Sequence, residues 1–142
     1  MKHILAATDG SEGADRAIAV AAALAKQFGA KLSILTSGSD LMDGGVEKLA
    51  RAEGDVGAAL DLMLNRVLLE AKRVAQAEGA TDIETHSAWG DPAEAIIEAA
   101  GRLHTDAIVL GRRGRGRLTG LLLGSVSQKV VTLAPCTVVV VP

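Results

Sequence analysis

Glycine, arginine and serine residues gather in one stretch near the C-terminal end of this chain. Residues 111–125 read GRRGRGRLTGLLLGS, with five glycines, four arginines and a closing Gly-Ser pair. Glycine permits positive φ angles and lets backbone N–H groups approach a ligand closely. A helix that starts at the Gly-Ser pair would add unpaired N–H donors and a partial positive charge, which together bind phosphate. Three interpretations fit the composition: a phosphate-binding loop, a flexible tether and an RNA-binding tract.

A second polar stretch, TDGSEG at residues 8–13, follows the first short aliphatic segment. Its carboxylate, Asp9, can accept hydrogen bonds from a ligand. The alternative is purely structural, since Asp9 or Ser11 can cap the helix that follows.

Short aliphatic runs alternate with helical patterns along the chain. Predicted helices cover residues 13–28, which end at Gly29, and 57–78; a third opens at Asp91-Pro92 and a fourth runs from Ser125 to before Pro135. The region 37–56 is predicted as a loop with a short helical segment at 46–52. The predicted strands cover residues 3–7, 31–36, 82–88, 106–111 and 136–141.

This order predicts an α/β fold in which one parallel sheet carries helices on both faces. Ligands of such sheets bind beyond the carboxyl ends of the strands, where the strand order reverses. If the first and fourth strands are neighbours, the two polar stretches face one crevice between helices that leave on opposite faces.

Other nucleotide and nucleic-acid motifs fit the glycine stretch poorly. A P-loop would need Lys and Ser/Thr where Arg117 and Leu118 stand, and the dinucleotide pattern GxGxxG fails because Gly120 comes one residue too late. RNA binding by stacking uses aromatic residues, and none lies between residues 90 and 142. The formal net charge is −2, so no overall field attracts nucleic acid.

The spacing Gly111-x2-Gly114-x9-Gly124-Ser125 resembles the nucleotide-binding signature of the universal stress protein family, in its ATP-binding branch. The resemblance extends over the chain, through ILAATDGSEGADRAI, GDPAEAIIEAA and SVSQKVVTLAPCTVVVVP. It implies a five-stranded Rossmann-like sheet of order 3-2-1-4-5, which has its switch point between the first and fourth strands.

The resemblance also implies roles for individual residues toward a bound adenine nucleotide. Asp9 would accept hydrogen bonds from adenine or ribose, with Ala7 and Thr8 beside it and Ser37 flanking the base. Leu110 and Gly111 would face the adenosine part. The residues expected along the phosphates are Gly114, Gly124, Ser125, Val126 and Ser127. Ala7 and Ser37 depart from the apolar residues that are common in the family at these positions.

ATP is the expected ligand, with ADP, AMP and a cyclic nucleotide as alternatives, and the serines can offer oxygen ligands to Mg²⁺. We expect a stress-response regulator with little or no turnover. A slow ATPase or nucleotide-dependent transferase, and a protein-interaction module without nucleotide, remain alternatives. No catalytic residue is assigned, and the histidines and Cys136 lack the spacing of metal ligands. Trp89 is interpreted as a packing residue.

The size and composition of the chain predict one soluble domain over residues 1–142. Apolar residues make up 49% of the sequence, and no apolar run approaches the length of a membrane span or of a signal peptide core. A single cysteine excludes an internal disulfide, which fits a cytoplasmic protein. The valine-rich last strand would lie at an edge of the sheet, so we expect a homodimer through residues 138–141, from Val138 to Val141.

Overall fold

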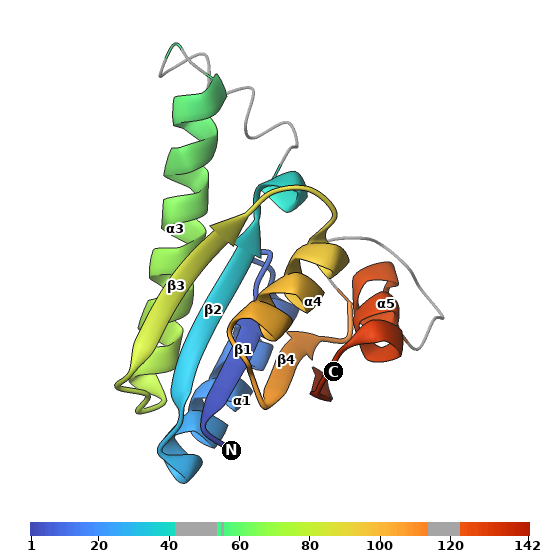
Figure 1. Cartoon of the computed structure of the whole chain (residues 1–142). Coiled ribbons are helices and arrows are strands. Elements are labelled where there is room, and N and C mark those ends of the chain that lie inside the picture. The colour runs from blue at the N-terminus through green and yellow to red at the C-terminus, as the bar shows by residue number, and fades with distance from the viewer. Residues whose placement is uncertain (42–53, 55, 114–122) are drawn as a thin grey trace.

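Five parallel strands form the centre of the protein in a computed structural model that describes residues 1–41, 54, 56–113 and 123–142 (Figure 1). Their order in the sheet is β3-β2-β1-β4-β5, which confirms the predicted fold class. Each boundary lies within one residue of its predicted position. The strands are β1 (His3–Ala7), β2 (Lys31–Ser37), β3 (Ile83–Ala88), β4 (Ala107–Gly111) and β5 (Thr137–Val141).

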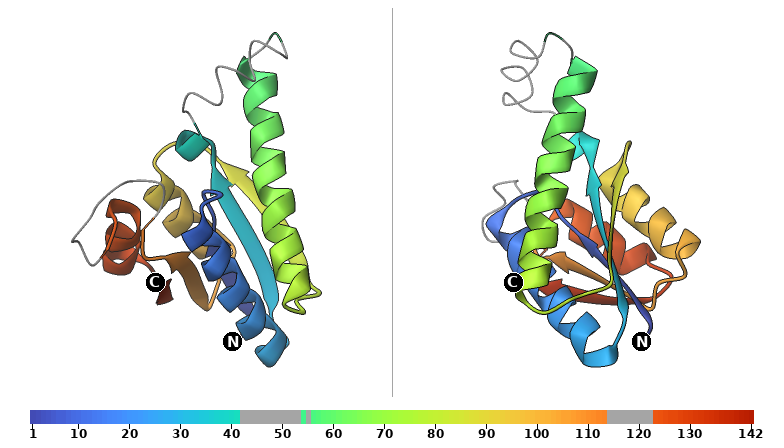
Figure 2. Two further views of the ribbon diagram at one scale, coloured as in Figure 1. Left: turned by 180° about the vertical axis from the view of Figure 1, so that it is seen from behind. Right: turned by 90° about the vertical axis from the view of Figure 1, so that its left-hand side faces the viewer.

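Helices cover both faces of the sheet (Figure 2). The helices α1 (Glu12–Phe28) and α3 (Val56–Ala77) pack on one face, and α4 (Pro92–Arg102) and α5 (Ser125–Leu133) on the other. Because alternate residues of a strand point to opposite faces, Ile4 belongs to the core beneath α1 and α3, whereas Leu5 belongs to the core beneath α4 and α5. Both side chains are completely buried.

Local capping residues set the ends of the helices. The Ser11 hydroxyl accepts a hydrogen bond of 3.2 Å from the Ala14 amide at the start of α1, and Gly29 ends that helix in the left-handed conformation, with φ of 62°. At the start of α4, the Asp91 carboxylate accepts a hydrogen bond of 2.9 Å from the Glu94 amide. The predicted caps Gly29 and Asp91 are therefore confirmed, and of the two residues that could cap α1, Asp9 and Ser11, it is Ser11 that does so.

The region after β2 begins differently from the predicted loop. A 3₁₀ helix, η1 (Gly38–Leu41), follows the strand directly. The helical segment expected at 46–52 lies outside the described residues. Trp89 packs against Gly38, where an added Cβ atom would lie 2.6 Å from the indole Cε3 atom. The indole nevertheless remains 58% exposed, so the interpretation of Trp89 as a packing residue describes only part of its surface.

The sheet places the starts of the two polar stretches side by side, at the carboxyl ends of neighbouring strands. β1 pairs with β4 in parallel, with Leu5 opposite Ile108. The loops that follow these strands therefore begin side by side, and α1 and α5 leave them on opposite faces of the sheet. In the described part of the chain, no helix is both long and apolar enough to cross a membrane.

Candidate functional site

Hydrogen bonds to its own backbone order the loop after β1. The Thr8 amide donates to the Leu35 carbonyl oxygen at 2.9 Å, which ties this loop to β2. The Thr8 hydroxyl accepts from the Gly10 amide at 3.1 Å, and the Asp9 carboxylate accepts from the Ser11 amide at 2.9 Å. Capping of α1 itself falls to Ser11. Asp9 is thus held at the carboxyl edge of the sheet without serving as the helix cap.

The loops after β1 and β4 touch at two glycines. A Cβ atom added to Gly111 would lie 3.2 Å from the Gly13 carbonyl oxygen, and one added to Gly13 would lie 3.3 Å from the Arg113 carbonyl oxygen. Neither Gly111 nor Gly124 has a positive φ angle. Close approach of backbones, rather than a left-handed conformation, therefore explains glycine at position 111.

The Arg112 backbone connects the end of β4 to both β5 and the start of α5. Its amide donates to the Val141 carbonyl oxygen at 2.7 Å, and its carbonyl oxygen accepts from the Gly124 amide at 2.9 Å. The buried Ser127 hydroxyl donates to the same carbonyl oxygen at 2.7 Å. These bonds close the segment between residues 112 and 124 at its base.

The N-terminus of α5 differs from those of α1 and α4. Its cap is Gly124, which makes no side-chain capping hydrogen bond, and its first turn contains no acidic residue. The first turn of α1, by contrast, carries Glu12 and Asp15. Burial raises the pKa of Asp15, and the charges of Glu70, Asp9 and Glu12 raise it further. An anion at this edge of the sheet is therefore favoured at α5 and disfavoured at α1.

The remaining residues predicted for the site lie at several depths. Ala7 is half-buried at the end of β1, and Ser37 is buried at the end of β2, where its hydroxyl donates to the Gly90 carbonyl oxygen at 3.4 Å. The Leu110 side chain packs in the core beneath α4 and α5, so only its backbone could face a ligand in the predicted crevice. Ser125 is exposed and Val126 half-buried in the first turn of α5. Gly114 lies outside the described residues.

A network of charges joins α5 to α4. The Lys129 ammonium lies 3.3 Å from the Asp91 carboxylate and 3.2 Å from the Glu94 carboxylate. The hydrogen bond from the Glu94 amide and the bond from Lys129 lower the pKa of Asp91, and the two carboxylates raise the pKa of Lys129. The N-terminal turns of the two helices are therefore held together beside the crevice.

The comparison with known proteins identifies the family. The family model described as the universal stress protein family matches residues 1–142. The chain belongs to the universal stress protein family. A universal stress protein from Thermus aquaticus, named for its position in the 3′ region of a QAH/OAS sulfhydrylase, is 40% identical over 99% of this chain and 98% of its own.

Further relatives and solved structures resemble the chain over almost its full length. The universal stress protein YxiE of Bacillus subtilis strain 168 is 35% identical, covering 97% of each chain. A crystal structure of a universal stress protein in complex with cAMP superposes with a TM-score of 0.74, at 30% identity, over 99% of this chain and 95% of that one. The family assignment thus rests on both sequence and fold.

Two groups that shape the contact between the loops after β1 and β4 were not identified from the sequence. Gly13 lies in the first turn of α1, and glycine is a poor helix former, so its presence there was the available signal for a close backbone contact. The Arg112 carbonyl group left no such signal, because backbone hydrogen bonds do not depend on side-chain type. In the described residues, no group of three or more His, Cys, Asp or Glu side chains could hold a metal ion.

Proposed function

We propose that this protein binds an adenine nucleotide, ATP foremost, in the crevice between the loops that follow β1 and β4. The observation that carries the proposal is the start of α5, where the helix dipole and the first-turn amides lack a capping side chain. This helix end lies at the switch point of the sheet, beside the contact between Gly13 and Gly111. Membership of the universal stress protein family and the cAMP complex of a family member support the choice of ligand.

The phosphates would lie at the N-terminus of α5. The exposed Ser125 can add its hydroxyl to the backbone amides of the first turn. Ser127 acts differently, because its hydroxyl donates to the Arg112 carbonyl oxygen and so positions the base of the loop. Gly114 and Val126 complete the phosphate side of the proposal, and Mg²⁺ bound by phosphate and serine oxygens would reduce the charge of ATP.

The nucleoside would lie toward β1 and β2. A carboxylate accepts several hydrogen bonds, so the bond from the Ser11 amide leaves Asp9 able to accept others from ribose or adenine. Ala7, Thr8 and Ser37 form the adjoining ends of the two strands. The backbones of Leu110 and Gly111 would face the base from β4.

We infer a regulatory rather than a catalytic role in the cytoplasmic stress response. Phosphoryl transfer needs an oriented water and a carboxylate that holds Mg²⁺ near the triphosphate. In this proposal Asp9 binds the nucleoside, and the first turn of α5 contains no acidic residue. ATP binding with negligible multi-turnover phosphate release supports this role, whereas release that is lost on changing Asp9 would support a slow ATPase.

The substitution Gly124→Asp tests the phosphate site directly. A Cβ atom at residue 124 would lie 3.4 Å from the Arg113 Cα atom, an ordinary contact, and φ of −75° suits any residue. The new carboxylate would cap α5, which stabilises a helix by a few tenths of a kcal/mol relative to glycine. It would also occupy the amides that phosphate needs. We expect unchanged or higher thermal stability and at least tenfold weaker ATP binding by calorimetry.

Gly101→Asp provides the matched control. Residue 101 is exposed on α4 with no atom within 4 Å of an added Cβ, so this variant changes the net charge equally and leaves the crevice intact. It should bind ATP as the unmodified protein does. Unchanged ATP affinity in folded Gly124→Asp, or no bound adenine nucleotide and no binding of ATP, ADP or AMP by the unmodified protein, would refute the proposal.

We also propose a homodimer formed by antiparallel pairing of β5 across two chains. β5 lies at an edge of the sheet, and its residues from Val138 to Val141 are aliphatic. Two apolar side chains of the neighbouring α5, Val131 and Leu133, are 46% and 56% exposed. Long apolar edges of this kind pair readily with other strands. Light scattering after size exclusion should give twice the mass of the chain, and a monomer at micromolar concentration would contradict the dimer.

A further inference from the structure

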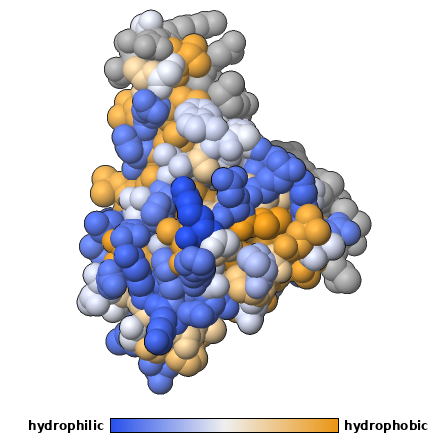
Figure 3. All heavy atoms as spheres, viewed as in Figure 1, coloured by the Kyte–Doolittle hydropathy of each residue, from blue (hydrophilic) through white to orange (hydrophobic). Residues whose placement is uncertain are grey.

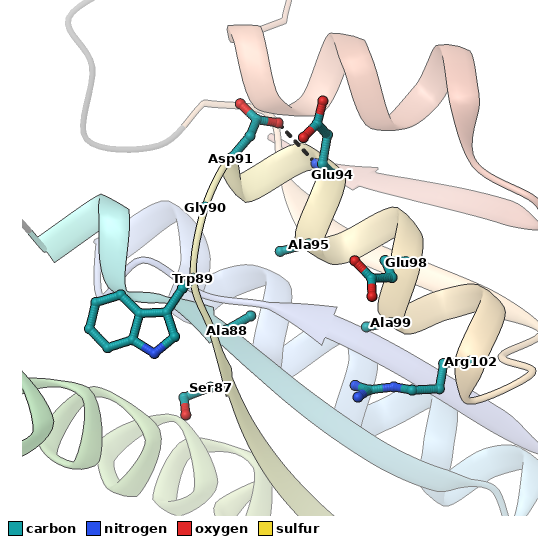
Figure 4. Close-up of a pocket in the computed structure, with 10 residues that line it drawn as sticks. All are labelled: Ser87, Ala88, Trp89, Gly90, Asp91, Glu94, Ala95, Glu98, Ala99 and Arg102. Carbon is teal, nitrogen blue, oxygen red and sulfur yellow. Dashed lines mark hydrogen bonds between the residues drawn. The ribbon is translucent and has the colours of Figure 1, made fainter.

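A groove separates the end of β3 from α4, apart from the crevice described above (Figure 4). Its volume is about 340 Å³, within the range of about 300–1,000 Å³ typical of small-molecule sites. The groove continues a face on which hydrophilic residues gather over β3 and α4 (Figure 3). It is lined by residues 87–91 at the end of β3 and by Glu94, Ala95, Glu98, Ala99 and Arg102 of α4.

Two opposite charges on α4 are directed over this groove and have no partner among the described residues. Glu98 and Arg102 are four residues apart, the spacing at which an ion pair on one helix is favourable. Neither side chain makes a hydrogen bond or ion pair with the described part of the chain. Figure 4 shows both side chains extending from α4 toward β3. The pair can therefore receive a ligand that carries an ammonium and a carboxylate group close together.

Trp89 borders the other end of the groove, with its indole extending away from α4 (Figure 4). The Trp89 indole contacts Gly38 on one side but is 58% exposed. The turn that carries it is held by the Ser39 hydroxyl, which donates to the Gly90 carbonyl oxygen at 2.6 Å. Asp91 and Glu94 lie on the rim next to this turn.

The balance of charge specifies the ligand further. Three carboxylates line the groove, from Asp91, Glu94 and Glu98, against the guanidinium of Arg102. Lys129 compensates one more charge through its bonds to Asp91 and Glu94. The remaining net charge is −1, which a ligand of net charge +1 would complement.

From these observations we propose that the groove between β3 and α4 binds a free α-amino acid with a cationic side chain. Arg102 would bind the α-carboxylate and Glu98 the α-ammonium group, because an α-amino acid carries these two opposite charges on the same carbon atom. The side chain would extend toward the carboxylates of Asp91 and Glu94 at the rim. A guanidinium forms paired hydrogen bonds with carboxylates more readily than an ammonium does, so L-arginine is the probe of choice.

Titration of the full-length protein with L-arginine tests the site, followed by calorimetry and by the fluorescence of Trp89, which is the one tryptophan in the chain. We expect saturable binding at millimolar concentrations or below. Agmatine lacks the carboxylate and citrulline lacks the charged side chain, so each should bind about tenfold more weakly or worse. Binding of L-glutamate as tight as that of L-arginine, or equal binding of agmatine or citrulline, would overturn the assignment.

Variants of the groove complete the experiment. Glu98→Gln and Arg102→Gln should each weaken L-arginine binding about tenfold. Glu78→Gln and Arg66→Gln remove the same charges from exposed positions outside the groove and should leave it unchanged. Absence of saturable L-arginine binding, or equal losses in the control variants, would refute the proposal. Because ATP binding is measured separately, either outcome leaves the proposed nucleotide site to its own test.

Discussion

The contact between Gly111 and Gly13 predicts that a single methyl group will strain the crevice. In Gly111→Ala, the added Cβ atom would lie 3.2 Å from the Gly13 carbonyl oxygen, 3.3 Å from its carbonyl carbon and 3.4 Å from the Arg113 carbonyl oxygen. All three atoms belong to the backbone, so no side-chain rotation relieves the contact. The first turn of α1 or the start of the loop after β4 has to move.

The expected loss of stability follows from two opposing effects. Overpacking of a close contact lowers the free energy of unfolding by about 1–3 kcal/mol. Alanine raises it by about 0.4–1 kcal/mol, because it restricts the unfolded chain more than glycine does. The net loss is about 0–2.6 kcal/mol with a midpoint of about 1.3 kcal/mol, which lowers the melting temperature of a chain of this size by about 4 °C at the midpoint. ATP affinity should fall as well, because the moving segments carry both sides of the proposed site.

Gly101→Ala is the matched control for this substitution. Gly101 lies within α4 and an added Cβ atom meets nothing within 4 Å, so alanine should stabilise the helix by about 0.5–1 kcal/mol. Urea denaturation followed by circular dichroism measures both variants. Opposite signs for the two free energies of unfolding are expected. If Gly111→Ala were as stable as the unmodified protein, the close backbone contact would not be the reason for glycine at this position.

Three further substitutions test other contacts. Gly38→Ala should displace the Trp89 indole, because the new Cβ atom would meet the ring at 2.6 Å; stronger acrylamide quenching of Trp89 fluorescence is expected, and unchanged quenching would contradict the contact. Ser127→Ala should cost about 0.5–1.5 kcal/mol in the free energy of unfolding by removing the bond to the Arg112 carbonyl oxygen, and should weaken ATP binding; equal stability would refute this role. Asp91→Asn keeps a capping oxygen but loses the attraction to Lys129. The folded-state pKa of Asp91 lies below 3.8, so its charge stabilises the fold above that pH and the benefit is lost as pH falls through the lowered pKa. The difference in the free energy of unfolding between Asp91→Asn and the unmodified protein should therefore shrink as the pH is lowered. A difference that does not change with pH would exclude the charge of Asp91 as its cause.

The sequence predicted the fold closely because local signals and the global pattern agree. Capping residues such as Ser11, Gly29 and Asp91 mark helix ends, and the continuous aliphatic segments are typical of parallel strands buried on both faces. The strand order came from the resemblance to the universal stress protein family. Strand alternation then accounts for the two cores, since each strand serves both faces.

The candidate site was less predictable at the level of individual side chains. Ser127 carries a hydroxyl suited to phosphate, yet the structure directs it to the Arg112 carbonyl oxygen. Leu110 occupies a predicted position, but its side chain packs in the core. Sequence motifs mark positions along the backbone; the direction of each side chain depends on tertiary contacts that the motif does not contain.

The position of Arg112 links the proposed nucleotide site to the proposed dimer. Its carbonyl oxygen accepts a hydrogen bond from the Gly124 amide, which joins the end of β4 to the start of α5 at the proposed nucleotide site. The Arg112 amide donates to Val141 on β5, the strand proposed to pair between chains. Any effect of ATP on the dimer through the Arg112 backbone must be reciprocal. If ATP strengthens the pairing of β5 between two chains, dimerisation raises the affinity for ATP by the same factor.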